Sequence, residues 1–196
     1  MSSLLIALLT SCSINVSPNL LQPLIQLESG YNPYAIGVVG SSIRQPHTLS
    51  EFIQSVTHLD NENKNYSIGL TQINIKNLNR LNIPVLDAVE PCNNIKLSSI
   101  ILQECYQKYG GIGQTLSCYY SGNDKTGFKR ENNNSYIERF IDAYTNRQND
   151  VSIHFDHEEF LKLKKQVVKT PVVTSQNQIK KNKKNKTKLY KTINLN

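Results

Sequence analysis

A chain of 196 residues has room for one compact domain and a tail, but not for two full domains. Its formal net charge of +7 is unevenly distributed, because eleven lysines and no acidic residue lie between Leu161 and the C-terminus. The tail therefore carries +11, and the first 160 residues carry −4. The basic character belongs to the tail, which argues against a folded nucleic-acid-binding domain.

The first apolar segment, MSSLLIALLTSC, has two interpretations. An apolar run followed by a cysteine is typical of a secretion leader, but no Lys or Arg precedes the run and its six residues are few for a leader. The run is also too short to span a bilayer. The alternative is the first helix of the domain, an interpretation that leaves the export route unexplained. Its apolar face would hold Leu4, Leu5, Leu8 and Leu9.

The second predicted helix is marked at both ends. Ser17 is a favourable N-cap, Pro18 suits the first helical position, and Gly30 is a natural residue to follow the last turn. Pro23 lies early enough in this helix to be tolerated. The stretch 31–44 is rich in Gly, Pro and Ser and also holds Ile and Val, which predicts a loop or a small hairpin.

Helical patterns dominate the middle of the chain. One begins near Thr48 or Ser50, either of which could be its N-cap. A connector is expected at 84–91. The predicted fold class is α+β, mainly α-helical, with a small β excursion after Tyr31. The predicted helices are 48–58, 67–80, 94–109, 115–120 and 135–147.

The character of the sequence changes at about residue 149. The stretch up to Lys165 has a weak helical pattern, whereas the run KKNKKNKTK lacks the apolar density that would offset the entropy of ordering. We therefore predict one folded domain at 1–148 and a basic, disordered tail at 149–196.

The four cysteines, Cys12, Cys92, Cys105 and Cys118, contain no CxxC pair, which disfavours a zinc site. An even number in a small domain suits two disulfides and an oxidising, extracytoplasmic compartment, with intracellular free thiols as the alternative. Four cysteines allow three pairings, and the sequence does not choose among them. As a hypothesis we pair Cys12 with Cys118 and Cys92 with Cys105.

Glu28 is the candidate for chemistry. It ends the apolar segment Leu24–Leu27 and is followed at once by SGYNP. A carboxyl group at the end of an apolar helix can lie partly in the core, where desolvation raises its pKa toward the value that a general acid needs near neutral pH. The alternative is a solvated glutamate at a helix end.

Four motifs, in order, carry a resemblance that favours the first alternative. ESGYNPYAIG resembles the catalytic-glutamate motif of the soluble lytic transglycosylases, which are related to goose-type lysozyme. GLTQIN, EPCNNI and LSCYYSG resemble three later motifs of that family, and Tyr136-Ile137 resembles its closing pair. The phrases IRQPHTLSEF, NYSIGLTQIN and CYYSGN are similar to the branch that accompanies type IV secretion and conjugation machines, with type III secretion and pilus-associated enzymes as the alternative. Members of that branch begin their domain with an apolar helix that leads to a Cys, so the resemblance implies that the segment ending at Cys12 is the first helix of the domain.

The resemblance implies a lysozyme-like fold and a mechanism with one carboxyl group. Glu28 would protonate the leaving oxygen of a MurNAc-β-1,4-GlcNAc bond and then deprotonate the MurNAc 6-hydroxyl, which attacks C1 and gives a 1,6-anhydro product. Neither a metal nor a cofactor is implied. The implied substrate-binding residues are Ser29, Gln72, Tyr119 and Tyr136.

Two positions depart from the family pattern. Thr71 replaces a Met, so a groove-lining contact is expected to be smaller and more polar, and Tyr120 replaces an Asn that contacts sugar. The other early carboxylates, Glu51, Asp60 and Glu62, lie in polar contexts outside any motif. A hydrolytic muramidase would need one of them as a second positioned carboxylate.

The implied partners are peptidoglycan strands and components of a secretion or conjugation machine, in the periplasm or another extracytoplasmic compartment. The lysine-rich tail could be a solvated end without function, or an electrostatic tether to anionic wall polymer or lipid. Nucleic acid is the least favoured partner of the tail, because no aromatic residues are interleaved with the lysines. A non-catalytic wall-binding assembly module on the same fold is a further alternative.

Overall fold

The N-terminal apolar segment forms helix α1 (Leu4–Cys12) in the computed structural model of the protein, which describes residues 4–147 and 151–169. Leu5, Leu9 and Cys12 are buried in one core with residues of α2 and α6, whereas Leu4 is 81% exposed. The predicted helix of the domain is confirmed, but its buried face is narrower than expected because it follows the spacing i, i+4, i+7. None of the described helices is long and apolar enough to cross a bilayer.

Helix α2 (Pro18–Ser29) has the ends that the sequence predicted. The Ser17 side chain accepts a hydrogen bond from the Asn19 N–H at 3.2 Å, and Gly30 follows the helix in the left-handed conformation at φ 55°. The Gly30 N–H donates to the Gln26 carbonyl at 3.1 Å. Pro23 lies inside the helix without shifting its start. These caps fix where α2 ends and so where Glu28 lies.

A three-stranded antiparallel sheet follows, with β1 (Ile36–Val38), β2 (Tyr66–Ile68) and β3 (Ile73–Asn74) in the order β1-β2-β3. Ile68 pairs with Ile36 on one side and Ile73 on the other. Helix α3 (Leu49–Asn61) connects β1 to β2, and Thr48 is its N-cap. The β excursion is therefore not a local hairpin, because its second strand comes almost thirty residues after the first.

The prediction of one helix across 67–80 is wrong in its first half. Those residues form β2, a tight turn and β3, and helix α4 (Ile75–Leu81) begins only after the Asn74 N-cap. The reason is the turn itself, in which Gly69 and Gln72 both adopt positive φ angles of 80° and 50° that no helix contains. The predicted connector at 84–91 also contains a short helix, α5 (Val85–Ala88).

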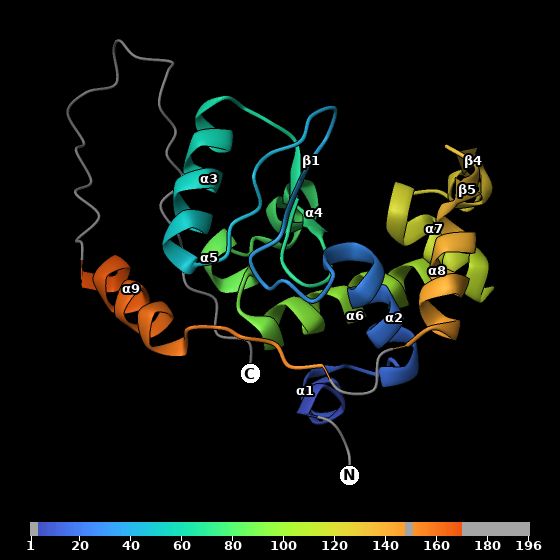
Figure 1. Ribbon diagram of the computed structural model, residues 1–196, viewed down its shortest axis with the longest axis horizontal. Coiled ribbons are helices and arrows are strands. Elements are labelled where there is room, and N and C mark those ends of the chain that lie inside the picture. Colours follow the sequence, from blue (N-terminus) through green and yellow to red (C-terminus); the bar gives the residue numbers. More distant parts are fainter. Residues whose placement is uncertain (1–3, 148–150, 170–196) are drawn as a thin grey trace.

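The second half of the domain is helical, as predicted. Helix α6 (Pro91–Tyr109) is its long central helix, and α7 (Ile112–Ser121) ends at Gly122 in the left-handed conformation. A 3-10 turn, η1 (Thr126–Phe128), and a hairpin of β4 (Arg130–Glu131) and β5 (Asn134–Ser135), none of them predicted, lead to α8 (Tyr136–Thr145). In Figure 1, α8 runs beside α2, and the two helices pack against each other.

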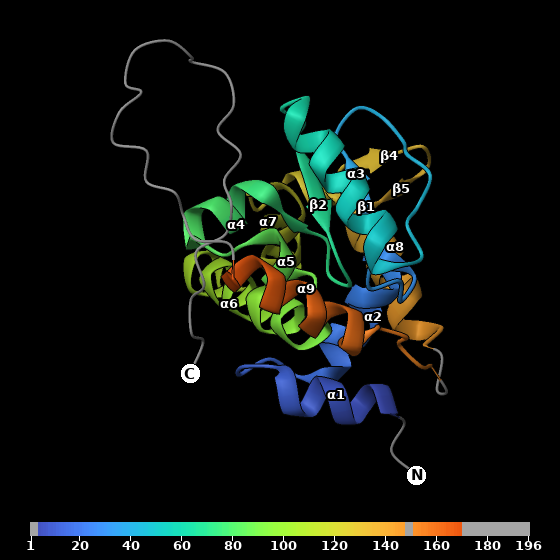
Figure 2. The ribbon, with the colours of Figure 1, turned by 90° about the vertical axis from the view of Figure 1, so that its left-hand side faces the viewer.

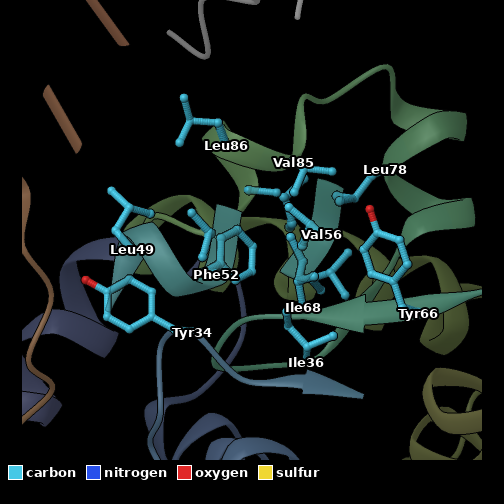
Figure 3. Packing of buried hydrophobic residues seen from close by; sticks show 14 of the residues in the cluster. Tyr34, Ile36, Leu49, Phe52, Val56, Tyr66, Ile68, Leu78, Val85 and Leu86 are labelled. Atoms are coloured by element: carbon cyan, nitrogen blue, oxygen red, sulfur yellow. The ribbon is translucent and has the colours of Figure 1, made fainter. Parts of the chain in front are cut away.

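The core divides into two clusters that meet at α6. One joins α1, α2, α6, α7 and α8. The other, shown in Figure 3, packs α3 and α5 against the sheet around Phe52, Val56, Tyr66 and Ile68. Tyr119 is packed against both clusters, which places it at the junction where a side chain can reach both halves of the domain.

The folded part of the chain continues beyond the predicted boundary at residue 148. We call residues 151–169 the strap: an extended segment followed by helix α9 (His157–Lys169), which crosses from α8 to lie over α5 and α6 (Figures 1 and 2). Val151 and Ile153 pack on one cluster, Phe160 is buried in the other, and Lys164 pairs with Asp87 at 2.8 Å. The prediction of a disordered tail from 149 is therefore wrong for the strap, because its alternating apolar residues bury against both clusters; 170–196 lie outside the described residues.

The two disulfides join Cys12 to Cys92 and Cys105 to Cys118. Our pairing hypothesis, Cys12 with Cys118 and Cys92 with Cys105, is wrong. Cys92 and Cys105 are thirteen residues apart on the same helix, α6, so that pairing would require the helix to break. The observed bonds tie α1 and α7 to opposite ends of α6.

Candidate active site

Glu28 lies in the last turn of α2, where the helix meets α8. Its side chain is only partly exposed, and its Oε1 accepts a hydrogen bond of 2.5 Å from the Tyr136 hydroxyl. Because Leu24, Ile25 and Leu27 pack into the core just before it, the carboxyl group lies at the edge of the core with little water around it. The sequence therefore predicted both the position and the environment of this group.

Burial raises the pKa of Glu28 from 4.5 to about 7, because desolvation disfavours the carboxylate. Two smaller effects oppose it: the hydrogen bond from Tyr136 and the positive charge of Arg139 both stabilise the ionised form. With a pKa near 7 the group exists in both protonation states at neutral pH. That is the requirement for a side chain that first donates a proton and then accepts one.

Tyr136 is the first residue of α8 and is held there by a capping box. The Ser135 hydroxyl accepts from the Glu138 N–H at 3.1 Å, and the Glu138 carboxylate accepts from the Ser135 N–H at 2.7 Å. Tyr136 is only 3% exposed, so its hydroxyl has little freedom to leave Glu28. Burial and the neighbouring Glu28 both raise the pKa of this phenol, which stays neutral and remains a donor.

Tyr119 connects Glu28 to the turn between β2 and β3. Its hydroxyl donates to the Thr71 carbonyl at 2.7 Å, and the nearby Glu28 contributes to raising its pKa. The structure thus brings Glu28, Tyr119 and Tyr136 together from α2, α7 and α8. These are three of the five residues that the sequence assigned to the site.

Gln72 occupies the same turn, but its amide serves the backbone. Its Nε2 donates to the Ala35 and Gly69 carbonyls, both at 3.0 Å, which joins the turn to the start of β1. Ser29 is likewise engaged, because its hydroxyl donates to the Ile25 carbonyl one turn earlier at 3.1 Å. Both side chains therefore use their donor groups within the protein. Both retain an oxygen that can accept a hydrogen bond.

Asn94 holds this turn in place and was not recognised as a site residue. Its buried amide accepts from the Thr71 N–H at 2.8 Å and hydroxyl at 2.7 Å, and donates to the Ile68 and Ala88 carbonyls. A Cβ atom on Gly69 would lie 2.4 Å from the Asn94 amide nitrogen, so only glycine fits there. Thr71 is fully buried, and the expectation that its side chain lines a groove is wrong.

Two exposed residues complete the surroundings of Glu28: Tyr120, which the sequence marked only as a departure from the family pattern, and Arg139, which was missed. The Tyr120 ring stacks on the Tyr136 ring, with centroids 4.4 Å apart and planes at 15°. The Arg139 guanidinium carbon lies 5.8 Å from the Tyr136 ring centroid. Arg139 follows Tyr136 by three residues, one turn of helix, and that spacing was the available signal.

The other early carboxylates have partners elsewhere. Glu51 accepts from the His47 N–H at 2.8 Å, and Asp60 accepts from the Tyr66 hydroxyl at 2.7 Å. Glu62 pairs with His58 and Lys64. Within residues 4–147 and 151–169, the charged side chain whose field affects the Glu28 pKa is the cationic Arg139, and no carboxylate does so.

One hollow of the described chain lies away from Glu28. An open hollow between the strap and the start of α3 is lined by Tyr34, His47, Phe155 and Asp156, and Glu28 is not among its lining residues. In the part of the chain that the structure describes, no three His, Cys, Asp or Glu side chains gather as metal ligands would.

Comparison with known proteins shows which family this chain is similar to. The transglycosylase SLT domain matches residues 9–141. The type IV secretion system proteins virB1 of Brucella abortus and Brucella suis are 37% identical over 147 residues, which are 69% of this chain and 62% of each relative. Protein virB1 of Rhizobium radiobacter is 25% identical over 138 residues, 65% of this chain and 55% of the relative. The chain thus spans less than two thirds of these relatives, and no solved structure matches it.

Proposed function

Because this chain belongs to the transglycosylase SLT domain family, we propose that it cleaves the MurNAc-β-1,4-GlcNAc bond of peptidoglycan with Glu28 as acid and then base. The observation that carries the proposal is the partly buried Glu28, with a pKa of about 7 and one oxygen held by Tyr136. Since Oε1 accepts from Tyr136, the acidic proton resides on Oε2, the oxygen left to face a substrate.

In the proposed reaction, the proton of Glu28 moves to the glycosidic oxygen as the bond between that oxygen and C1 of MurNAc breaks. Glu28, now ionised, accepts the proton of the MurNAc 6-hydroxyl, and O6 bonds to C1. The products are a 1,6-anhydroMurNAc end and a free GlcNAc 4-hydroxyl, and no water is consumed. Because the nucleophile is tethered to the reacting sugar, proximity does the work of a second carboxylate.

Among the described residues no second carboxylate affects the pKa of Glu28, and this supports the proposed chemistry over hydrolysis. Glycosidases that activate water or form a covalent intermediate place two carboxyl groups on either side of the bond. Among the described residues, Glu51, Asp60 and Glu62 are engaged with other partners. The two-carboxylate requirement of a muramidase is therefore not met by the residues that the sequence offered.

The other site residues have unequal parts in the proposal. Tyr136 positions Glu28, and Tyr119 presents a flat apolar face with a polar end, which suits a sugar ring. Ser29 and Gln72 would accept hydrogen bonds from the sugar, since their donor groups are already used within the protein.

We further propose that the chain opens the wall for a type IV secretion or conjugation apparatus, outside the cytoplasm. Relatives named as type IV secretion system proteins support the first part, and two disulfides suit the oxidising compartment of the second. The lysine-rich tail would add electrostatic attraction to anionic wall polymer or lipid.

Digestion of purified sacculi by the wild type and by Glu28→Gln, followed by mass spectrometry of the released muropeptides, tests the proposal. Anhydro-muropeptides are expected from the wild type, with a rate at least about 10³-fold lower for Glu28→Gln. Reducing-end products would show a hydrolytic muramidase. A folded wild type that binds sacculi and releases nothing would show a non-catalytic assembly module. Complementation of a secretion-deficient strain by wild type, but not by Glu28→Gln, tests the proposed role in secretion.

A further inference from the structure

Arg139 stands at the edge of the site in an unusual electrostatic situation. It lies one turn after Tyr136 on α8, with its guanidinium carbon 5.8 Å from the ring whose hydroxyl holds Glu28. Its positive charge opposes the rise in pKa that burial causes at Glu28, Tyr120 and Tyr136. The cation is therefore close to the group that would react.

The guanidinium group of Arg139 is exposed and has no carboxylate partner within residues 4–147 and 151–169. Three of the other four arginines are paired: Arg44 with Glu51, Arg80 with Glu104, and Arg130 with Glu138. The fourth, Arg147, lies over the Tyr144 ring, away from Glu28. Glu138 precedes Arg139 in the chain yet binds Arg130 and the Ser135 N–H. The structure thus leaves the donors of one arginine free beside Glu28.

A free arginine in this place counteracts part of the effect of burial on Glu28, because it stabilises the carboxylate that desolvation disfavours. A cation with only a packing role could be neutralised by a carboxylate, as the three paired arginines are. The planar guanidinium group is also suited to a specific ligand, since it binds a carboxylate through two parallel hydrogen bonds.

We propose that Arg139 is a substrate-binding residue that recognises a carboxylate on the muramyl sugar. This inference rests on the proposed function. A muramyl residue differs from the neutral GlcNAc by its lactyl group and attached stem peptide. The stem peptide has carboxylates of its own, and the lactyl carboxylate is free on residues from which the peptide has been removed. The contact would place the muramyl unit, with its C1 and 6-hydroxyl, against Glu28 and would keep GlcNAc out of that position.

Tyr120 shapes the same position. One of its faces is stacked on Tyr136 and its hydroxyl donates to Glu131 at 3.4 Å, but the residue is 39% exposed, so its other face is available to a ligand. Sugar rings and the methyl groups of a lactyl or alanyl unit present apolar faces that pack on tyrosine. Tyr120 and Arg139 together therefore provide one apolar and one cationic surface on the same side of Glu28.

The experiment compares Arg139→Met, which removes the charge, with Arg139→Lys, which keeps the charge and loses the planar fork. A matched control is Arg147→Met: Arg147 also lies over a tyrosine, Tyr144, at 4.2 Å, but eight residues farther along the chain and outside the site. Thermal unfolding of all three variants establishes that each is folded. KM and kcat are then measured on three soluble glycan substrates.

The two amidase-treated substrates differ from each other only in the lactyl carboxylate, whereas intact strands also carry the stem peptide. Intact strands carry those of the stem peptide, strands treated with a muramyl-alanine amidase carry that of the lactyl group, and amidase-treated strands coupled to methylamine carry neither. For Arg139→Met we expect KM to rise about fivefold on a carboxylate-bearing substrate and to stay unchanged on the neutral one. Arg139→Lys should lie between, and Arg147→Met should match the wild type on all three.

The pattern across substrates identifies the source of the carboxylate. An effect confined to intact strands assigns it to the stem peptide, and an effect confined to amidase-treated strands assigns it to the lactyl group. An equal change on all three substrates, or no change on any, would overturn the proposal, since Arg139 would then act only on Glu28 or not at all. A wild type inactive on every substrate would instead contradict the proposed function.

Discussion

On one side of Glu28, the turn between β2 and β3 uses its polar groups to hold itself together: Asn94 makes four hydrogen bonds, and the Gln72 amide bridges two carbonyls. On the other side, where α2 meets α8, a carboxyl group is desolvated and an arginine has no ion-pair partner among the described residues. We call these the turn side and the helix side. On the turn side the polar side chains stabilise the fold, whereas on the helix side Glu28 and Arg139 remain available to a ligand.

Each side also has a disulfide close by in the sequence. Cys92 precedes Asn94 by two residues on α6, and Cys118 immediately precedes Tyr119 on α7. The comparison therefore predicts different consequences for changes on the two sides: loss of stability on the turn side, and altered proton chemistry on the helix side.

The largest expected effect is on stability and concerns the disulfides. Removing the Cys12–Cys92 bond, which spans 80 residues, should lower the free energy of unfolding by about 4.5 kcal/mol, against about 3 kcal/mol for Cys105–Cys118, which spans 13, because the longer loop loses more entropy on closure. Guanidinium chloride unfolding of the two serine double variants measures this difference. A larger cost for the shorter loop would contradict the argument.

Asn94→Ala should cost about 3 kcal/mol of unfolding free energy, because it leaves buried donors and acceptors of Ile68, Thr71 and Ala88 without a partner. Asn93→Ala is the matched control: the Asn93 amide donates to the Asp87 carbonyl alone at 3.0 Å, and about 1 kcal/mol is expected. Equal costs in urea unfolding would show that the turn side does not depend on Asn94.

Glu28→Gln should stabilise the protein in a pH-dependent way. The pKa of Glu28 is about 7 in the folded protein and near 4.5 when unfolded, so the wild type is most stable below pH 4.5 and loses stability as the pH rises to 7. Above pH 7 the variant should be more stable by about 3 kcal/mol, and at pH 4 the two should be equal. Thermal melts at pH 4, 6 and 8 measure it; a difference independent of pH would mean that Glu28 is not desolvated.

The smallest predicted effect is that of Tyr136→Phe. Loss of the hydroxyl should lower kcat about tenfold, because Glu28 is no longer held in one orientation. It should also raise the pKa of Glu28 further, because the lost hydrogen bond favoured the carboxylate, and so move the alkaline limb of the pH–rate profile upward. Tyr144→Phe on the same helix serves as the control. A downward shift of the limb would contradict the assigned role of Tyr136.

Local signals were sufficient to predict Glu28 and its helix. Ser17, Pro18 and Gly30 fix the ends of α2 through contacts within four residues, and an apolar turn before Glu28 is enough to anticipate a desolvated carboxyl group. The capping box that positions Tyr136 is equally local. The motifs around these residues also predicted the family and the mainly helical α+β fold, because they are short segments whose order and spacing are visible in the chain.

Tertiary structure alone decided what depends on residues far apart in the chain. The apolar spacing in 67–80 fits a helix, but Ile68 lies in a strand because it pairs with Ile36 of β1, and that partner is distant in the sequence. The cysteine pairing follows from which helices lie beside α6, and the strap is ordered because two separate clusters accept its apolar residues. Arg139 follows Glu28 by 111 residues and affects its pKa only because α8 packs against α2, since a charge acts through space and not along the sequence.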